Sequence, residues 1–250
     1  MFVSGRSFYI PSLLMSDHEV TRAEWKDVMG SLPAYMGVPD YGAMYKKPVT
    51  VDWYEAVEYC NWRSLQEGLN PCYSINGYFD PGLWKENGLV RYDELNALFD
   101  WDKLVCNFEA NGYRLPTEAE WEWAARGGGD NTVYSGSDNI DKFGWYRGNS
   151  ENKVCYMRMT HKVKTKKPNG YGLYDMSGNV WEWCWDYYSD DILESTPATG
   201  PLSGYEFCIR GGSYKSYAEC CQIGYSTARS PKFYQDEAYD VGFRVVRKYD

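Results

Sequence analysis

The thiol groups near the end of the sequence are the side chains with the clearest capacity for redox or metal chemistry. Cys220 and Cys221 are adjacent, and Ser216 stands five positions before Cys221. Thiolates are soft ligands that bind Cu(I), whereas a serine hydroxyl is a hard and weakly acidic ligand. Two interpretations of this segment are open. It is either a thiol site in which one thiol is missing, or a binding surface that requires no thiol.

Other metal or disulfide sites find little support in the sequence. None of the eight cysteines forms a C-x-x-C pair, and the only two histidines are His18 and His161, so a structural zinc site is not expected. An even number of cysteines permits disulfides, but a chain of 250 residues can build a core without them. Most cysteines are therefore expected to be buried free thiols. A bridge between Cys220 and Cys221 would be strained, because adjacent Cα atoms lie about 3.8 Å apart and disulfides favour roughly 4.4–6.8 Å.

The composition argues against two classes of function. The chain has 26 basic and 35 acidic residues and a net charge of −9, which repels phosphate backbones, so nucleic acid is not expected as a partner. The longest apolar stretch, residues 8–15, is interrupted by Pro11 and is shorter than the about 20 residues of a transmembrane helix. We therefore expect no transmembrane segment. No linker or repeat is recognisable, so residues 1–250 are expected to form one domain.

Three helices are expected to position the chemistry-bearing residues, because three sequences have the signature of a capping box. In each of them a Thr or Asp that can cap the helix stands three residues before a Glu. The pairs are Thr21 with Glu24, Asp52 with Glu55, and Thr117 with Glu120. Glycines are expected to end the helices at Gly30, Gly68 and Gly127.

The remaining elements are expected to be strands and loops. Strand composition is found at residues 7–10, 180–186 and 242–248. Alternation in the second segment predicts one face with Val180, Glu182 and Cys184, and an opposite face with Trp181, Trp183 and Trp185. Loops rich in Gly, Asn and Asp are expected over residues 69–112 and 127–180. The expected fold class is α+β, with two to three helices on small antiparallel sheets and long irregular loops.

Four motifs resemble the formylglycine-generating (sulfatase-modifying factor) family and follow one another in the order typical of it. They are GYRLPTEAEWEWAARGG at residues 112–128, PNGYGLYDMSGNVWEW at 168–183, RGGSY at 210–214 and GFRVV at 242–246. The sequence DHEVTRAEW at residues 17–25 fits the start of the same family. This resemblance covers nearly the whole chain. It implies a variant of the C-type lectin fold that is elaborated by long loops.

The resemblance also implies an oxidase chemistry for which this chain lacks one residue. Oxidases of the family convert a sulfatase cysteine to formylglycine, using copper held by two cysteines that lie five residues apart, just after the GGSY motif. The matching positions here are 216 and 221, and position 216 is serine. Because one thiolate cannot form a two-sulfur site, we expect no enzyme and no catalytic cofactor. The alternative is a formylglycine-generating-type oxidase, or a related enzyme with an altered active site. The two histidines are expected to be structural or solvated.

Residues 213–240 have the composition of a binding surface. Five Tyr, one Phe and four Ser occur there without hydrophobic periodicity. Tyr provides a large contact area at low entropy cost, and Ser provides adaptable hydrogen bonds. The alternative is an ordinary family loop in a chain that has 24 Tyr. The location, flanks and composition of the segment are similar to those that diversity-generating retroelements rewrite in treponemal variable proteins of this fold.

This second resemblance implies a non-catalytic variable protein that binds its ligand through residues 213–240. The expected ligand is an unidentified macromolecule, a protein rather than a nucleic acid, bound by a monomer. A bacterial cell surface or periplasmic location is expected, through a leader or lipid anchor absent from this sequence. The residues expected to contact the ligand are Tyr214, Ser216, Tyr217, Glu219, Cys220, Tyr225, Ser226, Ser230, Lys232, Phe233, Tyr234, Asp236, Glu237, Tyr239 and Asp240.

The family resemblance further implies one structural calcium ion. In the family, a segment of the NxxGNxWEW type binds calcium through two side chains and two backbone carbonyl groups. The matching positions are Asp175, Gly178, Val180 and Glu182. Calcium favours such oxygen ligands. The alternative is that Asp175 and Glu182 cap loops and pair with nearby bases, and the sequence leaves both interpretations open.

Overall fold

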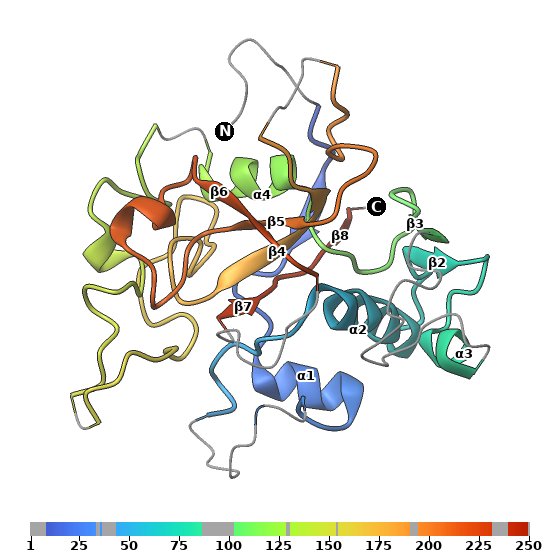
Figure 1. The fold of residues 1–250 in the computed structure, drawn as a ribbon, viewed down its shortest axis with the longest axis horizontal. Coiled ribbons are helices and arrows are strands. Elements are labelled where there is room, and N and C mark those ends of the chain that lie inside the picture. Colours follow the sequence, from blue (N-terminus) through green and yellow to red (C-terminus); the bar gives the residue numbers. More distant parts are fainter. Residues whose placement is uncertain are drawn as a thin grey trace.

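The computed structural model describes residues 9–33, 36, 44–86, 103–128, 131–153, 155–190, 195–231 and 240–249 (Figure 1). All three expected helices are present: α1 (Arg22–Met29), α2 (Trp53–Gln66) and α4 (Glu118–Ala125). Each begins with a complete capping box, in which the Thr or Asp side chain accepts from the backbone of the Glu three residues later. None of the helices in the described part of the chain has the length and apolar character needed to cross a membrane.

The described strands form three small sheets. β1 (Leu13–Met15) pairs with β8 (Val246–Lys248), and β2 (Tyr73–Ile75) pairs with β3 (Leu104–Cys106). The third sheet has four strands in the order β6 (Ser226–Arg229), β5 (Phe207–Arg210), β4 (Trp181–Tyr187) and β7 (Val241–Gly242). The first residues of the motifs RGGSY and GFRVV, Arg210 and Gly242, therefore lie on either side of Glu182 in β4.

These elements confirm the expected α+β class with small sheets, and they correct several details of it. The described residues contain a fourth α-helix, α3 (Pro81–Glu86), and two short 3₁₀ helices, η3 (Ile140–Lys142) and η4 (Ala218–Cys221). β7 runs parallel to β4, so the sheets are not all antiparallel. Of the strand expected over residues 7–10, the first two residues lie outside the described part, and the other two precede the actual strand β1.

The strand expected over residues 242–248 is in fact two strands, β7 and β8. Between them the backbone leaves the four-stranded sheet, because Phe243 and Val245 accept hydrogen bonds from Val20 and Ser16 at 2.8 and 2.9 Å. The chain then joins β1. This crossing brings the side chain of Arg244 to Glu182 on β4, with Nη2–Oε1 and Nε–Oε2 distances of 2.6 and 2.7 Å.

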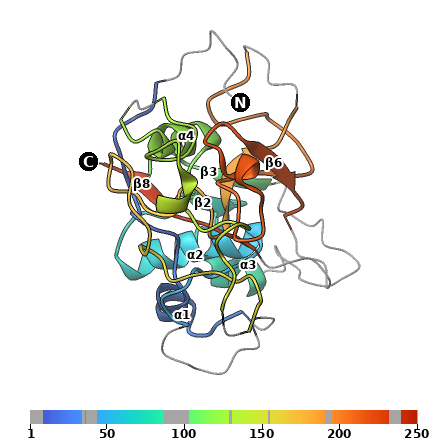
Figure 2. The same ribbon diagram turned by 90° about the vertical axis from the view of Figure 1, so that its left-hand side faces the viewer.

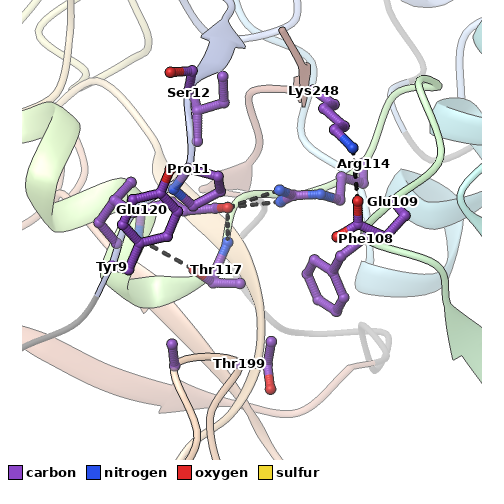
Figure 3. Close-up of a pocket in the computed structure, with 13 residues that line it drawn as sticks. Tyr9, Pro11, Ser12, Phe108, Glu109, Arg114, Thr117, Glu120, Thr199 and Lys248 are labelled. Carbon is purple, nitrogen blue, oxygen red and sulfur yellow. Dashed lines mark hydrogen bonds and ion pairs between the residues drawn. The ribbon is translucent and has the colours of Figure 1, made fainter. Parts of the chain in front are cut away.

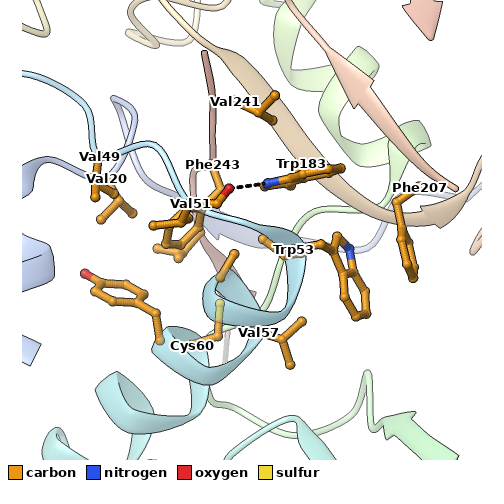
Figure 4. Close-up of a cluster of buried hydrophobic side chains, with 14 of the residues drawn as sticks. Val20, Val49, Val51, Trp53, Val57, Cys60, Trp183, Phe207, Val241 and Phe243 are labelled. Carbon is orange, nitrogen blue, oxygen red and sulfur yellow. Dashed lines mark hydrogen bonds between the residues drawn. The ribbon is translucent and has the colours of Figure 1, made fainter. Parts of the chain in front are cut away.

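The two faces of β4 are buried against different helices, as the alternation predicts. Trp181 and Trp183 belong to a large core that also contains Trp53 of α2. The Trp53 ring stacks on Phe207 at 3.8 Å, and Trp183 Nε1 donates to the backbone oxygen of Val51 at 2.8 Å (Figure 4). Cys184 belongs to a second core beneath α4, beside Trp121. In Figures 1 and 2, α4 lies on one side of the four-stranded sheet and α1 and α2 lie on the other.

All eight cysteines are free thiols, and five of them are buried. This agrees with the expectation for most of them, and Cys220 and Cys221 are not bridged. The histidines contact structural groups. His18 lies at the start of α1 against Asp17 and 3.5 Å from Glu24, and His161 stacks on Trp145 with ring centroids 3.7 Å apart.

Candidate ligand-binding surface

The segment that follows β5 is fixed by a tight backbone turn. Gly211 and Gly212 have φ values of 90° and 75°, which side chains other than glycine rarely adopt. A Cβ atom on Gly212 would also overlap the sulfur of Cys221. Ser213 is buried, and its Oγ donates to Asp240 Oδ2 at 2.6 Å. The segment therefore starts from a rigid base within the fold.

The side-chain hydroxyl at position 216 forms hydrogen bonds within the turn. Ser216 Oγ accepts a hydrogen bond from the backbone N of Ser213 at 3.0 Å and lies 3.2 Å from its Oγ. The thiol of Cys221 is buried and donates to the backbone oxygen of Tyr217 at 3.6 Å. Burial raises the pKa of the Cys221 thiol, and nearby Cys220 and Glu219 raise it further. Because the thiolate is the form that binds metals and attacks substrates, this thiol is inert as placed.

The outer part of the segment presents polar and aromatic side chains to solvent. Tyr217 is 62% exposed, Glu219 is exposed, and Tyr225 is 38% exposed. The guanidinium carbon of Arg147 lies 4.7 Å from the centre of the Tyr217 ring, and Tyr225 lies 6.0 Å from the ring of Trp181. Each tyrosine therefore contacts a neighbouring side chain, Arg147 or Trp181, and also has part of its ring exposed to solvent. The half-buried members of the predicted set are Ser216, Cys220, Ser226 and Ser230.

Two predicted contact residues do not lie on this surface. Tyr214 and Asp240 are buried, with 9% and 8% of their area exposed. Asp240 accepts the hydrogen bond from Ser213, and the Tyr214 backbone oxygen accepts from Ser150 Oγ at 2.7 Å, so both belong to the base of the turn. We correct the prediction for these two. Six others lie outside the described residues: Lys232, Phe233, Tyr234, Asp236, Glu237 and Tyr239.

A neighbouring loop contributes residues that sequence reasoning missed. The backbone N of Arg147 donates to the backbone oxygen of Ser216 at 2.9 Å, which joins residues 142–167 to the surface. Trp145 is covered by His161 on its ring and by Lys166, whose Nζ lies 3.9 Å from the ring centre. The run of basic residues in this loop was visible in the sequence. Its position beside Ser216 was not, because the contact spans about 70 residues of the chain.

The four positions matched to a calcium site lie inside the fold. Both carboxylate oxygens of Glu182 are engaged, by Arg244 and by Trp121 Nε1 at 2.6 Å. Asp175 accepts from the backbone N of Lys164 at 2.8 Å through Oδ2, and its Oδ1 is buried without a partner. Gly178 and Val180 donate their backbone N–H groups to Gly211 and Glu19.

These contacts test whether Asp175 and Glu182 bind calcium or instead pair with nearby bases. Glu182 does not fit as a calcium ligand while a guanidinium and an indole occupy its oxygens, whereas Asp175 keeps one oxygen free. In the described part of the chain, no three or more His, Cys, Asp or Glu residues gather as a metal site. Burial raises the pKa of Asp175 to about 6. Calcium binding stays a prediction. The contacts favour pairing with a base for Glu182, whereas Asp175 bonds the backbone of Lys164.

A separate pocket of about 190 Å³ lies beside the paired strands β1 and β8 (Figure 3). Arg114 and Glu120 form a double hydrogen-bonded ion pair there, at 2.6 and 2.7 Å, and Lys248 bonds Glu109 at 2.6 Å. The charged groups in this pocket therefore neutralise one another. No residue of the segment after β5 lines it.

Comparisons with known proteins agree with this architecture. The family model described as "Sulfatase-modifying factor enzyme 1-like domain" matches residues 5–249. The solved structure of Treponema denticola variable protein 1 is similar with a TM-score of 0.77 and 38% identity, over 95% of this chain and 84% of that one.

Two curated relatives cover most of the chain. "Chaperone protein LppX" of Paenibacillus barcinonensis is 35% identical over 98% of this chain and 83% of its own length. The formylglycine-generating enzyme of Mus musculus is 34% identical over 97% of this chain and 68% of its own length. The similar proteins thus include both an enzyme and a variable protein.

Proposed function

Because the chain belongs to the sulfatase-modifying factor enzyme 1-like family, in which both enzymes and a variable protein are similar to it, we propose that it is a non-catalytic, ligand-binding member. The ligand binds the surface formed by the described residues Ser216, Tyr217, Glu219, Cys220 and Tyr225. We call these five residues the ligand surface. Its ligand is a macromolecule, and we take it to be a protein.

The observation that carries this proposal is the state of the two positions matched to the oxidase thiols. Ser216 supplies a hydroxyl that bonds the Ser213 backbone, and Cys221 is a buried thiol with a raised pKa. Neither group is available as a soft, exposed thiolate, which a Cu(I) site requires. A site with one inert sulfur does not support the two-sulfur chemistry.

The start of the segment after β5 is buried and its outer part is exposed, and this difference supports diversification by a retroelement. Arg210 and Ser213 are fully buried and Gly212 is constrained, while Tyr217 and Glu219 are exposed. Substitutions at exposed positions change stability by only about ±0.5 kcal/mol, so such positions can vary without loss of the fold. Further copies of the gene that differ only within residues 213–240 are expected.

The alternative function is a formylglycine-generating-type oxidase, which is favoured by the similarity to the mouse enzyme. The test is to incubate the protein with copper and a peptide carrying a sulfatase-type C-x-P-x-R motif, and to analyse the peptide by mass spectrometry. We expect no aldehyde product from the native chain. The Ser216→Cys variant is the matched comparison, because it restores a sulfur at the position matched to the missing thiol. Aldehyde formed by the native chain would contradict the proposal.

A further inference from the structure

The charge of this protein is strongly segregated. Residues 142–167 contain eight Lys or Arg and one Glu, a net charge of +7, in a chain whose net charge is −9. The rest of the chain therefore carries −16, which is −9 minus +7. We call residues 142–167 the basic flank. Charged surfaces of one sign steer partners of the opposite sign and raise their association rates.

The cations of the basic flank are largely unneutralised. Within the described part of the chain, Lys164 is the one member of the flank that forms an ion pair, with Asp17 at 2.6 Å. Six of the other cations are exposed: Lys142, Arg147, Lys153, Arg158, Lys162 and Lys167. Lys166 is half-buried against Trp145 and donates to the backbone oxygen of Asp141 at 2.5 Å, and it forms no ion pair with a described carboxylate.

The basic flank is continuous with the ligand surface. Arg147 bonds the Ser216 backbone through its own backbone N and lies over the ring of Tyr217 through its guanidinium. Arg158 Nε donates to the backbone oxygen of Arg147 at 3.0 Å. The segments that carry these two arginines therefore lie next to each other. Figure 1 shows the flank in yellow-green to yellow on the same side of the molecule as the red helix η4.

Exposed apolar side chains border these cations. Tyr156 and Met157 are 78% and 64% exposed, next to Arg158. Tyr, Met and Arg are the residue types enriched in protein–protein interfaces. A long, uniformly charged polyanion such as a nucleic acid would extend beyond the flank and be repelled by the remaining charge of −16. A compact acidic patch on a protein would not.

We propose that the ligand of this protein is an acidic protein surface, whose carboxylates bind the basic flank at Arg147 and Arg158 while its remaining contacts fall on the ligand surface. This inference rests on the proposed function and adds to it the chemical class of the partner. Bidentate guanidinium–carboxylate hydrogen bonds are the specific contact that these two arginines can offer.

The experiment titrates a short fluorescent poly-L-glutamate chain against the native protein at low and physiological ionic strength. We expect binding that weakens with added salt, and a loss of at least about tenfold in affinity for the Arg147→Glu/Arg158→Glu variant. The matched control is Lys103→Glu/Lys248→Glu, which changes the net charge equally at Lys103, just before β3, and at Lys248 of β8, which is paired with Glu109. The control should bind as the native protein does. A second variant, Lys153→Glu/Lys162→Glu, repeats the test at exposed side chains, and circular dichroism checks folding.

Three results would overturn the inference. They are no binding of poly-L-glutamate, equal loss in the control variant, and tighter binding of an oligonucleotide or a sulfated polysaccharide than of poly-L-glutamate through the same arginines. None of these results bears on the tyrosines of the ligand surface. The proposed function can therefore stand if the acidic-partner inference fails.

Discussion

At the scale of single residues, the position matched to the first oxidase thiol carries an oxygen in place of a sulfur. Ser216 uses that oxygen to hold the Ser213 backbone, so the hydroxyl has a structural task of its own. On the proposed function, this hydrogen bond gives the residue at position 216 a structural role that does not depend on copper chemistry. The sequence shows that residue 216 is a serine, but it does not show that the hydroxyl of this serine accepts a hydrogen bond from the Ser213 backbone.

Asp175 provides a test of the buried charges around β4. Its pKa of about 6 in the fold lies above the ordinary value of 3.8, so the folded state favours the protonated form. The associated stability is fully present below pH about 4 and is lost as the pH rises through about 6. An Asp175→Asn variant keeps an oxygen for Lys164 and carries no charge. We expect it to be more stable than the native protein by about 1–3 kcal/mol at pH 7.5, with the difference shrinking toward pH 4.

Thermal denaturation across this pH range measures the effect, and the same curves test calcium. If Asp175 bound calcium, a chelator would lower the melting temperature of the native protein, and the Asp175→Asn variant would be less stable and insensitive to the chelator. We expect no effect of the chelator, because Glu182 is already satisfied by Arg244 and Trp121. A chelator-sensitive melting temperature would instead support the calcium interpretation.

At the scale of elements, the segments with strong local signals were predictable and the short ones were not. Capping boxes identified α1, α2 and α4, and alternation identified β4. β2, β3 and β6 have three or four residues each and carry no periodic pattern, so only their partners determine them. The same holds for the surface: composition indicated exposed tyrosines, but the burial of Tyr214 and the contact with Arg147 depend on distant parts of the chain.

The turn between β5 and η4 is expected to tolerate no side chain at Gly212. A Gly212→Ala variant would require a Cβ atom in the space of the Cys221 sulfur and a φ of 75°. We expect a loss of about 1–3 kcal/mol in the free energy of unfolding, from the overlap and the backbone strain. Gly224→Ala is the control, because no atom lies within 4 Å of its added Cβ. Denaturant unfolding of both variants measures the difference, and equal stabilities would show that the turn is not constrained as described.

The core and the surface are expected to respond oppositely to the loss of an aromatic ring. Trp183 is fully buried in the large core, so Trp183→Ala should cost about 3–5 kcal/mol or prevent folding. Tyr217→Ala should change the free energy of unfolding by about ±0.5 kcal/mol, because Tyr217 is 62% exposed. Chemical denaturation compares the two. A large loss for Tyr217→Ala would place its ring in ordinary packing rather than on the ligand surface.

At the scale of the whole molecule, buried ion pairs connect the strands and helices inside the fold, while the charge on the outside is unevenly distributed. Glu182 and Arg244 link β4 to the chain between β7 and β8, and Arg210 on β5 contacts Glu122 of α4. Removing one partner of such a buried pair typically costs about 3–5 kcal/mol, so these contacts belong to the fold and not to the ligand. The ligand surface and the basic flank lie outside these buried pairs, and the backbone hydrogen bond between Arg147 and Ser216 joins them to one another.

The measurement that tests the central claim most directly is binding of a protein partner, recovered by a display screen, to matched double variants. Tyr217→Ser/Tyr225→Ser removes the two described tyrosines of the ligand surface. The control, Tyr171→Ser/Tyr205→Ser, removes two tyrosines that are 50% and 97% exposed elsewhere. We predict that both variants melt like the native protein, that the first loses at least about 2 kcal/mol of binding free energy as interface hot spots do, and that the control binds normally. Unchanged binding by the first variant, or equal loss in both, would contradict the account.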